Sequence, residues 1–167
     1  MKIKHKQIYF PVWKGNIRKK INSSNRIIFA KMQIFSKANS KEDHFTTLAP
    51  CIGILFYNLK NKESYIMHEP YTTKSNLVSK IIQIKKDWKI PLKKITVNCY
   101  GGSETNYVPP NRGNNQLISK EKQYAEKILK KIFPEKNLSF DWAKNDTITS
   151  FYLDKQKETQ HIFSQHF

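Results

Sequence analysis

The stretch CIGILFYNLKNKESYIMH, residues 51–68, consists of two strand-like runs joined by a polar break. Ile52–Tyr57 is apolar and rich in strand-forming residues, and Ser64–Met67 resumes the pattern after several asparagines and lysines. The spacing predicts an antiparallel hairpin. Folding the chain back at the middle of the break places Cys51 opposite His68, with Cβ atoms about 4.5–5.5 Å apart.

Cys51 and His68 are therefore candidates for a catalytic pair, because a thiol beside an imidazole can become a reactive thiolate. By itself, a cysteine among apolar residues is more often a small buried hydrophobe. We interpret the second cysteine, Cys99, in that way, since it lies within a predicted strand. His44 falls in a predicted polar loop, where we expect it to be solvated.

The size and composition predict one domain with a real core. The chain has 167 residues with 10 Phe, 8 Tyr and 3 Trp. We find neither an apolar run long enough to span a membrane nor a readable export signal. Two cysteines are too few for a secreted disulfide scaffold or a typical zinc site, so we expect a cytoplasmic bacterial protein without metal or cofactor.

The net charge of +17 has two interpretations. It can attract an acidic partner such as nucleic acid, or it can be a solvated lysine-rich surface. Arginine, which makes bidentate contacts to bases, is scarce, so we favour the solvated surface and expect a monomer.

The order of the predicted elements indicates the fold class. Residues 1–25 form a basic N-terminal extension, and 26–167 form a single domain. Strands are expected at 27–35, 45–48, 94–100, 138–142, 148–153 and 160–163, besides the hairpin, and helices from Ser75 to Pro91 and from Ser119 to Pro134. Two amphipathic helices each need a sheet to cover, which predicts an α/β fold, a layered α-β-β sandwich with mixed or antiparallel sheets.

Several segments resemble the CheD family of chemoreceptor glutamine deamidases. The sequence TLAPCIGI at 47–54 resembles the segment around the family's nucleophilic cysteine, and His68 matches its catalytic histidine in spacing. VNCYGGS at 97–103 is similar to the family's strand and glycine turn, and the segment from Asp141 to Leu153 resembles its last strand-turn-strand. By order of elements, the resemblance covers about residues 27–160 and implies a sandwich of CheD type.

The resemblance implies a protein-glutamine deamidase that works through a thioester. Cys51 would attack the side-chain amide, and His68 would take the thiol proton and pass it to the departing ammonia. Thr47, or alternatively Thr46, would hold the second imidazole nitrogen, as the third member of a triad does.

The remaining implications concern the oxyanion and the partners. Ile52, Gly101 and Gly102 would lie in the region that binds the substrate and its oxyanion. The substrate would be a protein with an exposed glutamine, and a regulatory protein of the chemotaxis system is a further expected partner.

Two alternatives remain open at this point. The family's Gly-Ser before the cysteine is Ala49-Pro50 here, and proline has no N–H to donate. The chain could therefore be a catalytically weakened interaction module that binds an acidic protein or nucleic acid. It could also be a secreted effector that deamidates a host protein.

Overall fold

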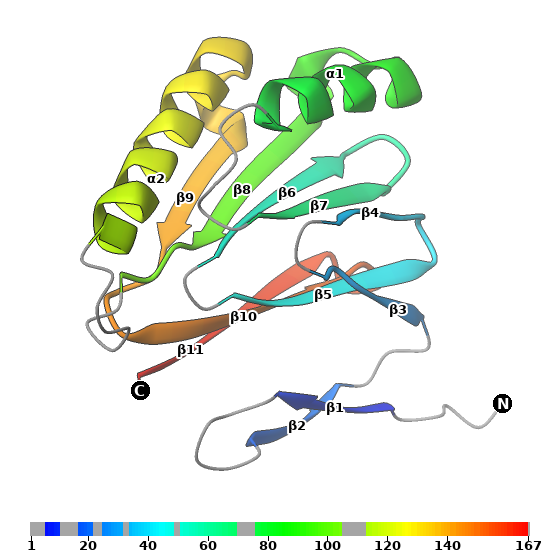
Figure 1. The fold of residues 1–167 in the computed structure, drawn as a ribbon. Coiled ribbons are helices and arrows are strands. Elements are labelled where there is room, and N and C mark those ends of the chain that lie inside the picture. Colours follow the sequence, from blue (N-terminus) through cyan, green and yellow to red (C-terminus); the bar gives the residue numbers. More distant parts are fainter. Residues whose placement is uncertain are drawn as a thin grey trace, which may run out of the picture.

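The computed structural model describes residues 6–10, 17–21, 25–31, 34–48, 51–69, 76–104 and 113–166. These residues form a mixed α/β structure with two main sheets and two helices (Figure 1). The five-stranded sheet has the order β4-β7-β6-β8-β9, the four-stranded sheet has the order β11-β10-β5-β3, and β1 and β2 form a separate pair.

The bounds of the elements are as follows. The strands are β1 Lys6–Phe10, β2 Ile17–Ile21, β3 Arg26–Phe29, β4 Phe35–Ala38, β5 Glu42–Leu48, β6 Ile52–Asn58, β7 Ser64–Glu69, β8 Ile95–Gly101, β9 Leu138–Trp142, β10 Thr147–Asp154 and β11 Thr159–His166. The helices are α1 Asn76–Trp88 and α2 Gly113–Ile132, with short 3-10 turns at Leu92–Lys94 and Glu135–Asn137.

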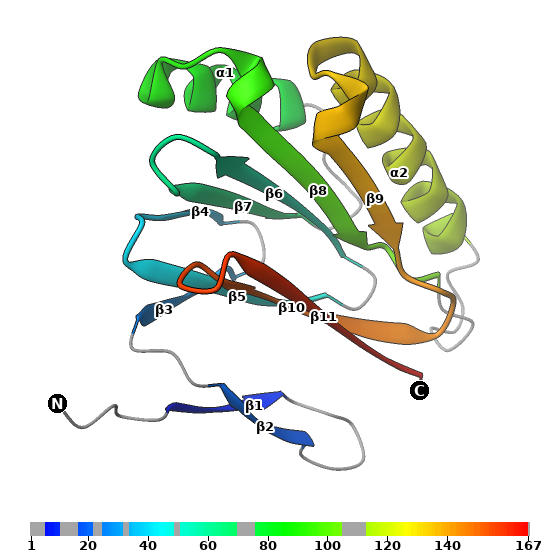
Figure 2. The same ribbon diagram turned by 180° about the vertical axis from the view of Figure 1, so that it is seen from behind.

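The elements stack in three layers. Both helices cover one face of the five-stranded sheet, and the four-stranded sheet lies against its other face (Figures 1 and 2). Both sheets are mixed, because β8 pairs with β9 and β3 pairs with β5 in parallel while their other pairings are antiparallel. The predicted mixed α/β class is therefore confirmed. No described helix is both long and apolar enough to cross a membrane.

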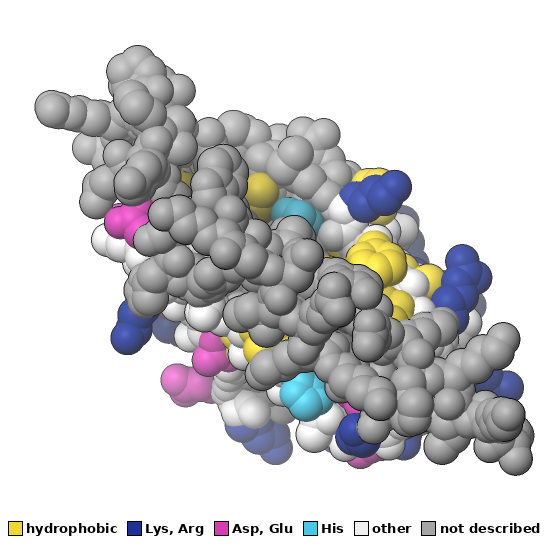
Figure 3. Space-filling view, turned by 90° about the horizontal axis from the view of Figure 1, so that it is seen from below, with side chains coloured by type: hydrophobic (Ala, Val, Ile, Leu, Met, Phe, Trp, Pro, Cys, Tyr) yellow, Lys and Arg dark blue, Asp and Glu magenta, His cyan; other side chains and the backbone are white. Residues whose placement is uncertain are grey.

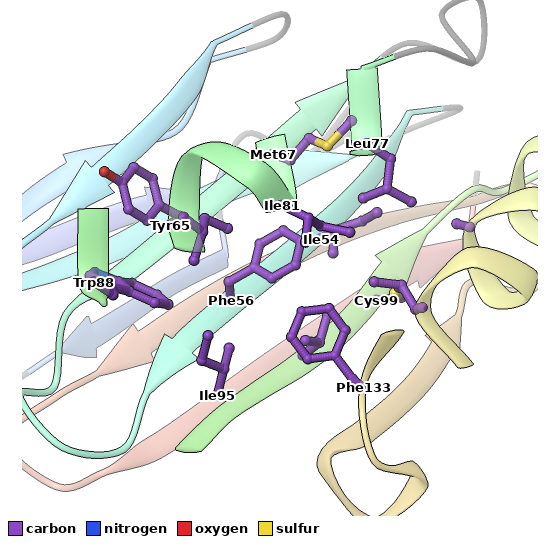
Figure 4. Packing of buried hydrophobic residues seen from close by; sticks show 14 residues of the cluster. Ile54, Phe56, Tyr65, Met67, Leu77, Ile81, Trp88, Ile95, Cys99 and Phe133 are labelled. Atoms are coloured by element: carbon purple, nitrogen blue, oxygen red, sulfur yellow. The ribbon is translucent and has the colours of Figure 1, made fainter. Parts of the chain in front are cut away.

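A first hydrophobic core fills the space between the helices and the five-stranded sheet (Figure 4). Phe56 on β6 and Phe133 after α2 have ring centroids 6.1 Å apart, and Ile81 of α1 packs in the same cluster. Burying a side chain of this size contributes about 1.5–3 kcal/mol. Cys99 belongs to this core and is 0% exposed, as its position in a strand predicts.

A second core lies between the two sheets and borders the candidate site. Leu55 and Ile66 from the five-stranded sheet contact the four-stranded sheet, and the rings of Tyr100 and Phe151 stack with centroids 4.4 Å apart. Cys51 belongs to this cluster. Residues of β6 alternate between the two cores, as the two-residue period of a strand requires.

The predicted hairpin is confirmed, but its predicted register is wrong by two residues. His68 pairs with Gly53, and Ile52 pairs with Glu69, so Cys51 does not lie directly opposite His68. The hairpin is centred one residue further along the chain than expected, since Tyr57 pairs with Ser64 and the N–H of Asn58 donates to the carbonyl of Glu63 at 2.9 Å. Within the turn, the Asn58 side chain accepts the backbone N–H of Lys60 at 2.9 Å.

Other element boundaries also differ from the sequence predictions. The run expected as one strand at 27–35 is split into β3 and β4, which belong to different sheets. The second helix starts at Gly113 instead of Ser119, and β5, β10 and β11 are longer than expected. The basic extension at 1–25 includes strands β1 and β2, and its residues 1–5, 11–16 and 22–24 lie outside the described part of the chain.

Candidate functional site

Cys51 stands at the beginning of β6, on the face directed between the two sheets. Its side chain is free of disulfide and only 8% exposed. Its carbonyl oxygen accepts the N–H of Gly102 at 2.8 Å, which connects the residue to the end of β8. Ala49 and Pro50, which precede it, lie outside the described residues.

His68 ends up on the same face as Cys51, near the C-terminal end of β7. Its direct partner is Gly53, which lies two residues after Cys51. Cys51 and His68 are therefore diagonal neighbours, for which Cα atoms are about 7–8 Å apart and longer side chains remain within reach. His68 is 7% exposed, so both side chains lie at the margin of the second core.

The Nδ1 side of the His68 ring is held by two hydrogen-bond acceptors. Nδ1 lies 3.0 Å from Oγ1 of Thr46 and 3.1 Å from the carbonyl oxygen of Ala30. The Thr46 hydroxyl donates to that same carbonyl at 2.9 Å, so its oxygen is left to accept a proton from the ring. This arrangement assigns the proton of the neutral ring to Nδ1 and leaves Nε2 as the basic nitrogen.

Thr47, the first of the two threonines predicted as the third residue, does not lie at the His68 ring. Its hydroxyl lies 3.1 Å from Oγ of Ser150 on β10. Adjacent residues of a strand point to opposite faces, so only Thr46 can point between the sheets toward His68. Thr47 is corrected to Thr46 as the threonine at the ring.

Glycines at positions 53 and 101 allow neighbouring segments of the chain to pack closely around Cys51 and Leu48. A Cβ atom on Gly53 would lie 2.7 Å from Cδ1 of Leu48, and one on Gly101 would lie 2.6 Å from the carbonyl oxygen of Cys51. Gly101 and Gly102 also have left-handed φ angles of 75° and 69°. The turn after β8 can therefore pack against Cys51 only if these residues are glycine.

The three residues expected to form the oxyanion region connect strands in the structure. Ile52 pairs with Glu69 on one side and with Gly101 on the other. The N–H of Gly102 is already donated to the carbonyl of Cys51. Gly102 therefore positions Cys51 and has no backbone proton left for a substrate.

Burial and charge keep both members of the pair neutral at neutral pH. Burial raises the pKa of the Cys51 thiol, and the nearby negative charge of Glu69 raises it further. Burial lowers the pKa of His68, although its hydrogen bond to the Ala30 carbonyl opposes this effect. At neutral pH the two groups are therefore a thiol and an uncharged imidazole on the same face of the sheet, rather than a thiolate and an imidazolium.

Sequence reasoning missed two features of this region. The Ala30 carbonyl comes from the segment that crosses between the sheets, and a backbone oxygen gives no residue-type signal. His44 was expected to be solvated, yet it is fully buried on β5 between Oγ of Ser64 at 2.9 Å and Oγ of Ser36 at 3.2 Å. Within the described ranges, no group of three His, Cys, Asp or Glu side chains is arranged to hold a metal.

Comparisons with known proteins give structural matches only. No family model matches the sequence, and no curated protein matches it. YfiH of Bacillus licheniformis, described as a hypothetical protein, is 10% identical over 59% of this chain and 46% of its own, with a TM-score of 0.42. NMB0706 of Neisseria meningitidis, described with the family DUF152, is 9% identical over 72% of this chain and 64% of its own, with a TM-score of 0.49.

YlmD of Geobacillus stearothermophilus is a third match, 10% identical over 66% of this chain and 51% of its own, with a TM-score of 0.48. The chain thus spans less than two thirds of each of the three matched proteins. These proteins belong to a different family from CheD. The predicted membership of the CheD family is therefore wrong. The same holds for protein glutamine deamidation and for a role in chemotaxis. The alternatives of a weakened interaction module and a secreted effector also find no support.

Proposed function

We propose that the protein is a cysteine-dependent hydrolase that cleaves a linear amide bond, with Cys51 as nucleophile and His68 as base. The observation that carries this proposal is the fixed orientation of the His68 ring. Its Nδ1 is held by Thr46 and the Ala30 carbonyl, so Nε2 is the nitrogen left to act on a thiol of the same sheet face. A base oriented by a third group is the arrangement that thiol and hydroxyl nucleophiles share.

The neutral resting state determines the order of the steps. Nε2 of His68 takes the proton from Sγ of Cys51 as the sulfur attacks the carbonyl carbon of the amide. The imidazolium then donates this proton to the nitrogen of the leaving amine or ammonia, and the C–N bond breaks to give a thioester. A water molecule, deprotonated by the same imidazole, adds to the thioester, releases the carboxylic acid and restores the thiol.

Thr46 supports this cycle by stabilising the ring when it is positively charged. The imidazolium must keep donating from Nδ1, and both Oγ1 of Thr46 and the carbonyl of Ala30 accept there. These acceptors are neutral, so they stabilise the imidazolium less than a carboxylate would. The proposal therefore predicts that the base regains its neutral form readily after each proton transfer.

The test uses a simple acyl donor, p-nitrophenyl acetate, because it requires no knowledge of the natural substrate. We expect acetylation of Cys51, detected by mass spectrometry of the intact protein and its peptides, together with release of p-nitrophenol. Cys51→Ala should abolish the reaction. His68→Asn should slow acylation by about 10²-fold or more, as expected for loss of a general base.

Cys99 supplies the matched control, because it is also a buried free cysteine. Cys99→Ala should leave the acylation rate unchanged. Labelling of Cys99 in place of Cys51, or an acylation rate that is insensitive to His68→Asn in a folded protein, would overturn the proposal.

A further inference from the structure

The four edges of the two main sheets are not equally protected. An exposed strand edge presents unpaired backbone groups that can pair with another chain, and proteins usually block it with short strands, charges or a covering helix. At one edge, β3 has four residues, and its Arg26 forms an ion pair with Glu42. At another, β4 also has four residues, and its Lys37 forms an ion pair with Asp87.

The third edge, β9, is covered by a helix. The indole N–H of Trp142 donates to Glu126 of α2 at 2.7 Å, and the Lys130 ammonium lies 5.3 Å from the centre of the Phe140 ring. The strand also carries a charge at Asp141.

At the fourth edge, β11, none of these protections is formed by the described residues. It is eight residues long and pairs with β10 along its whole length, and it ends its sheet among the described strands. Its sequence TQHIFSQH contains no Lys, Arg, Asp or Glu, although the chain has 30 basic and 13 acidic residues. Ile162 is 41% exposed, and Gln160, His161 and Ser164 are exposed as well.

Basic, acidic and histidine side chains of the described residues are visible in the view from below (Figure 3). A chain with a net charge of +17 repels its own copies wherever lysines would meet. An edge without charge is the part of such a molecule that a second copy can approach at least electrostatic cost.

We propose that β11 pairs with β11 of a second copy, antiparallel about a two-fold axis, to form a dimer with a continuous eight-stranded sheet. In an antiparallel two-fold contact, residues near the axis lie beside their own copies, so a lysine near the middle of β11 would be brought close to another lysine. The uncharged sequence fits this requirement. The proposal replaces the monomer expected from the sequence and is independent of the chemistry at Cys51.

A second copy fits this edge better than a foreign acidic partner does. An acidic strand would be attracted by lysines, and β11 offers none. A strand that pairs with its own copy needs only free backbone groups and uncharged side chains that can lie beside the same strand of the second copy.

The experiment measures the mass of the full chain in solution by light scattering and sedimentation over a range of concentrations. We expect the wild type to reach twice the 19.8 kDa of a single chain. Ile162→Lys and, separately, Ser164→Lys should weaken the dimer by at least about tenfold in Kd, because each brings two like charges close together near the middle of the new strand pairing. Both positions are exposed, so folding should be retained and can be checked by circular dichroism.

Ile82→Lys is the matched control, because it adds the same charge at an isoleucine that is 48% exposed on α1. It should remain as dimeric as the wild type. A wild type that stays monomeric at all concentrations would overturn the proposal. This holds also if slow exchange of the β11 amide protons shows that another part of the chain covers the outer edge of the strand. A dimer that resists both lysine substitutions on β11 would also overturn it.

Discussion

Thr46 and Thr47 are chemically identical neighbours, and the pleat of β5 alone decides which of them contacts His68. Thr46 points between the sheets and lies 3.0 Å from Nδ1 of the ring, while Thr47 points to the other face and lies 3.1 Å from Ser150. Each hydroxyl has a polar partner, so the two residues form a natural pair for comparison.

The first prediction uses this pair. Thr46→Val keeps the shape of the side chain but removes the oxygen that accepts from Nδ1, leaving only the Ala30 carbonyl. We expect the acylation rate of Cys51 to fall about three- to tenfold, which corresponds to the loss of one hydrogen bond. NMR of the ring nitrogens of His68 should also show a larger population of the tautomer protonated at Nε2.

Thr47→Val is the control for this prediction, because it also removes one side-chain hydrogen bond. Its stability should decrease by a similar amount, while the acylation rate and the His68 tautomer stay unchanged. Equal effects of the two substitutions on the rate would show that Thr46 has only a structural role.

Two residues of this site could be predicted from the sequence, but the groups that hold the His68 ring could not. Cys51 and His68 could be found because two strand-like runs bring them to one end of a hairpin. The choice between Thr46 and Thr47 could not be made, because a one-residue uncertainty in register reverses the face of a strand. The Ala30 carbonyl could not be found, since the contact depends on where the backbone crosses between sheets.

At the scale of elements, the hairpin was predictable and its register was not. The apolar runs on both sides of the break determine that two strands form. The register depends on the turn, where Asn58 accepts the N–H of Lys60 and Lys62 adopts a φ of 61°. Asparagine and lysine in a polar break do not specify one loop length, so a displacement of two residues could not be foreseen.

The second prediction concerns the turn that holds the start of β6. Gly101→Ala would bring a Cβ atom to 2.6 Å from the Cys51 carbonyl oxygen, at a φ of 75°. Backbone cannot move away easily, and the left-handed conformation adds strain of about 1–3 kcal/mol. We expect the free energy of unfolding to fall by more than about 3 kcal/mol in urea titration, because overpacking adds to that strain.

Gly53→Ala is the matched comparison, because it adds the same methyl group at a glycine next to the same leucine. There the nearest atom is Cδ1 of Leu48 at 2.7 Å, the end of a side chain that can rotate. The cost should be smaller, about 1–2 kcal/mol for moderate overpacking. If Gly53→Ala destabilised the protein more than Gly101→Ala, the packing of the turn against Cys51 would not be the limiting constraint.

At the scale of the whole molecule, the layers could be predicted and the division of strands between the sheets could not. Two amphipathic helices require a sheet, but nothing in the run from Ile27 to Phe35 marks the point where the chain leaves one sheet for the other. His44 shows the consequence. It looked like a loop residue, and it is in fact a buried link from β5 to Ser36 and Ser64 of the opposite sheet.

This link makes the stability of the whole sandwich depend on pH. Burial, assisted by the positive charge of Lys155, lowers the pKa of His44 to about 3. In the unfolded chain, a histidine titrates near its ordinary value of about 6.5. Between these two values the unfolded state binds a proton that the folded state does not, so the free energy of unfolding decreases as the pH falls below about 6.5.

The third prediction is therefore a loss of stability at mildly acidic pH. From about pH 6.5 to 5, before most carboxylates titrate, His44 should remove up to roughly 2 kcal/mol, at about 1.4 kcal/mol per pH unit. Urea titrations at a series of pH values measure this slope. His44→Gln, which keeps a polar side chain between the two serines, should flatten it. A slope that survives His44→Gln unchanged would mean that the acid sensitivity originates elsewhere, with His68, whose pKa is also lowered by burial, as the next residue to substitute.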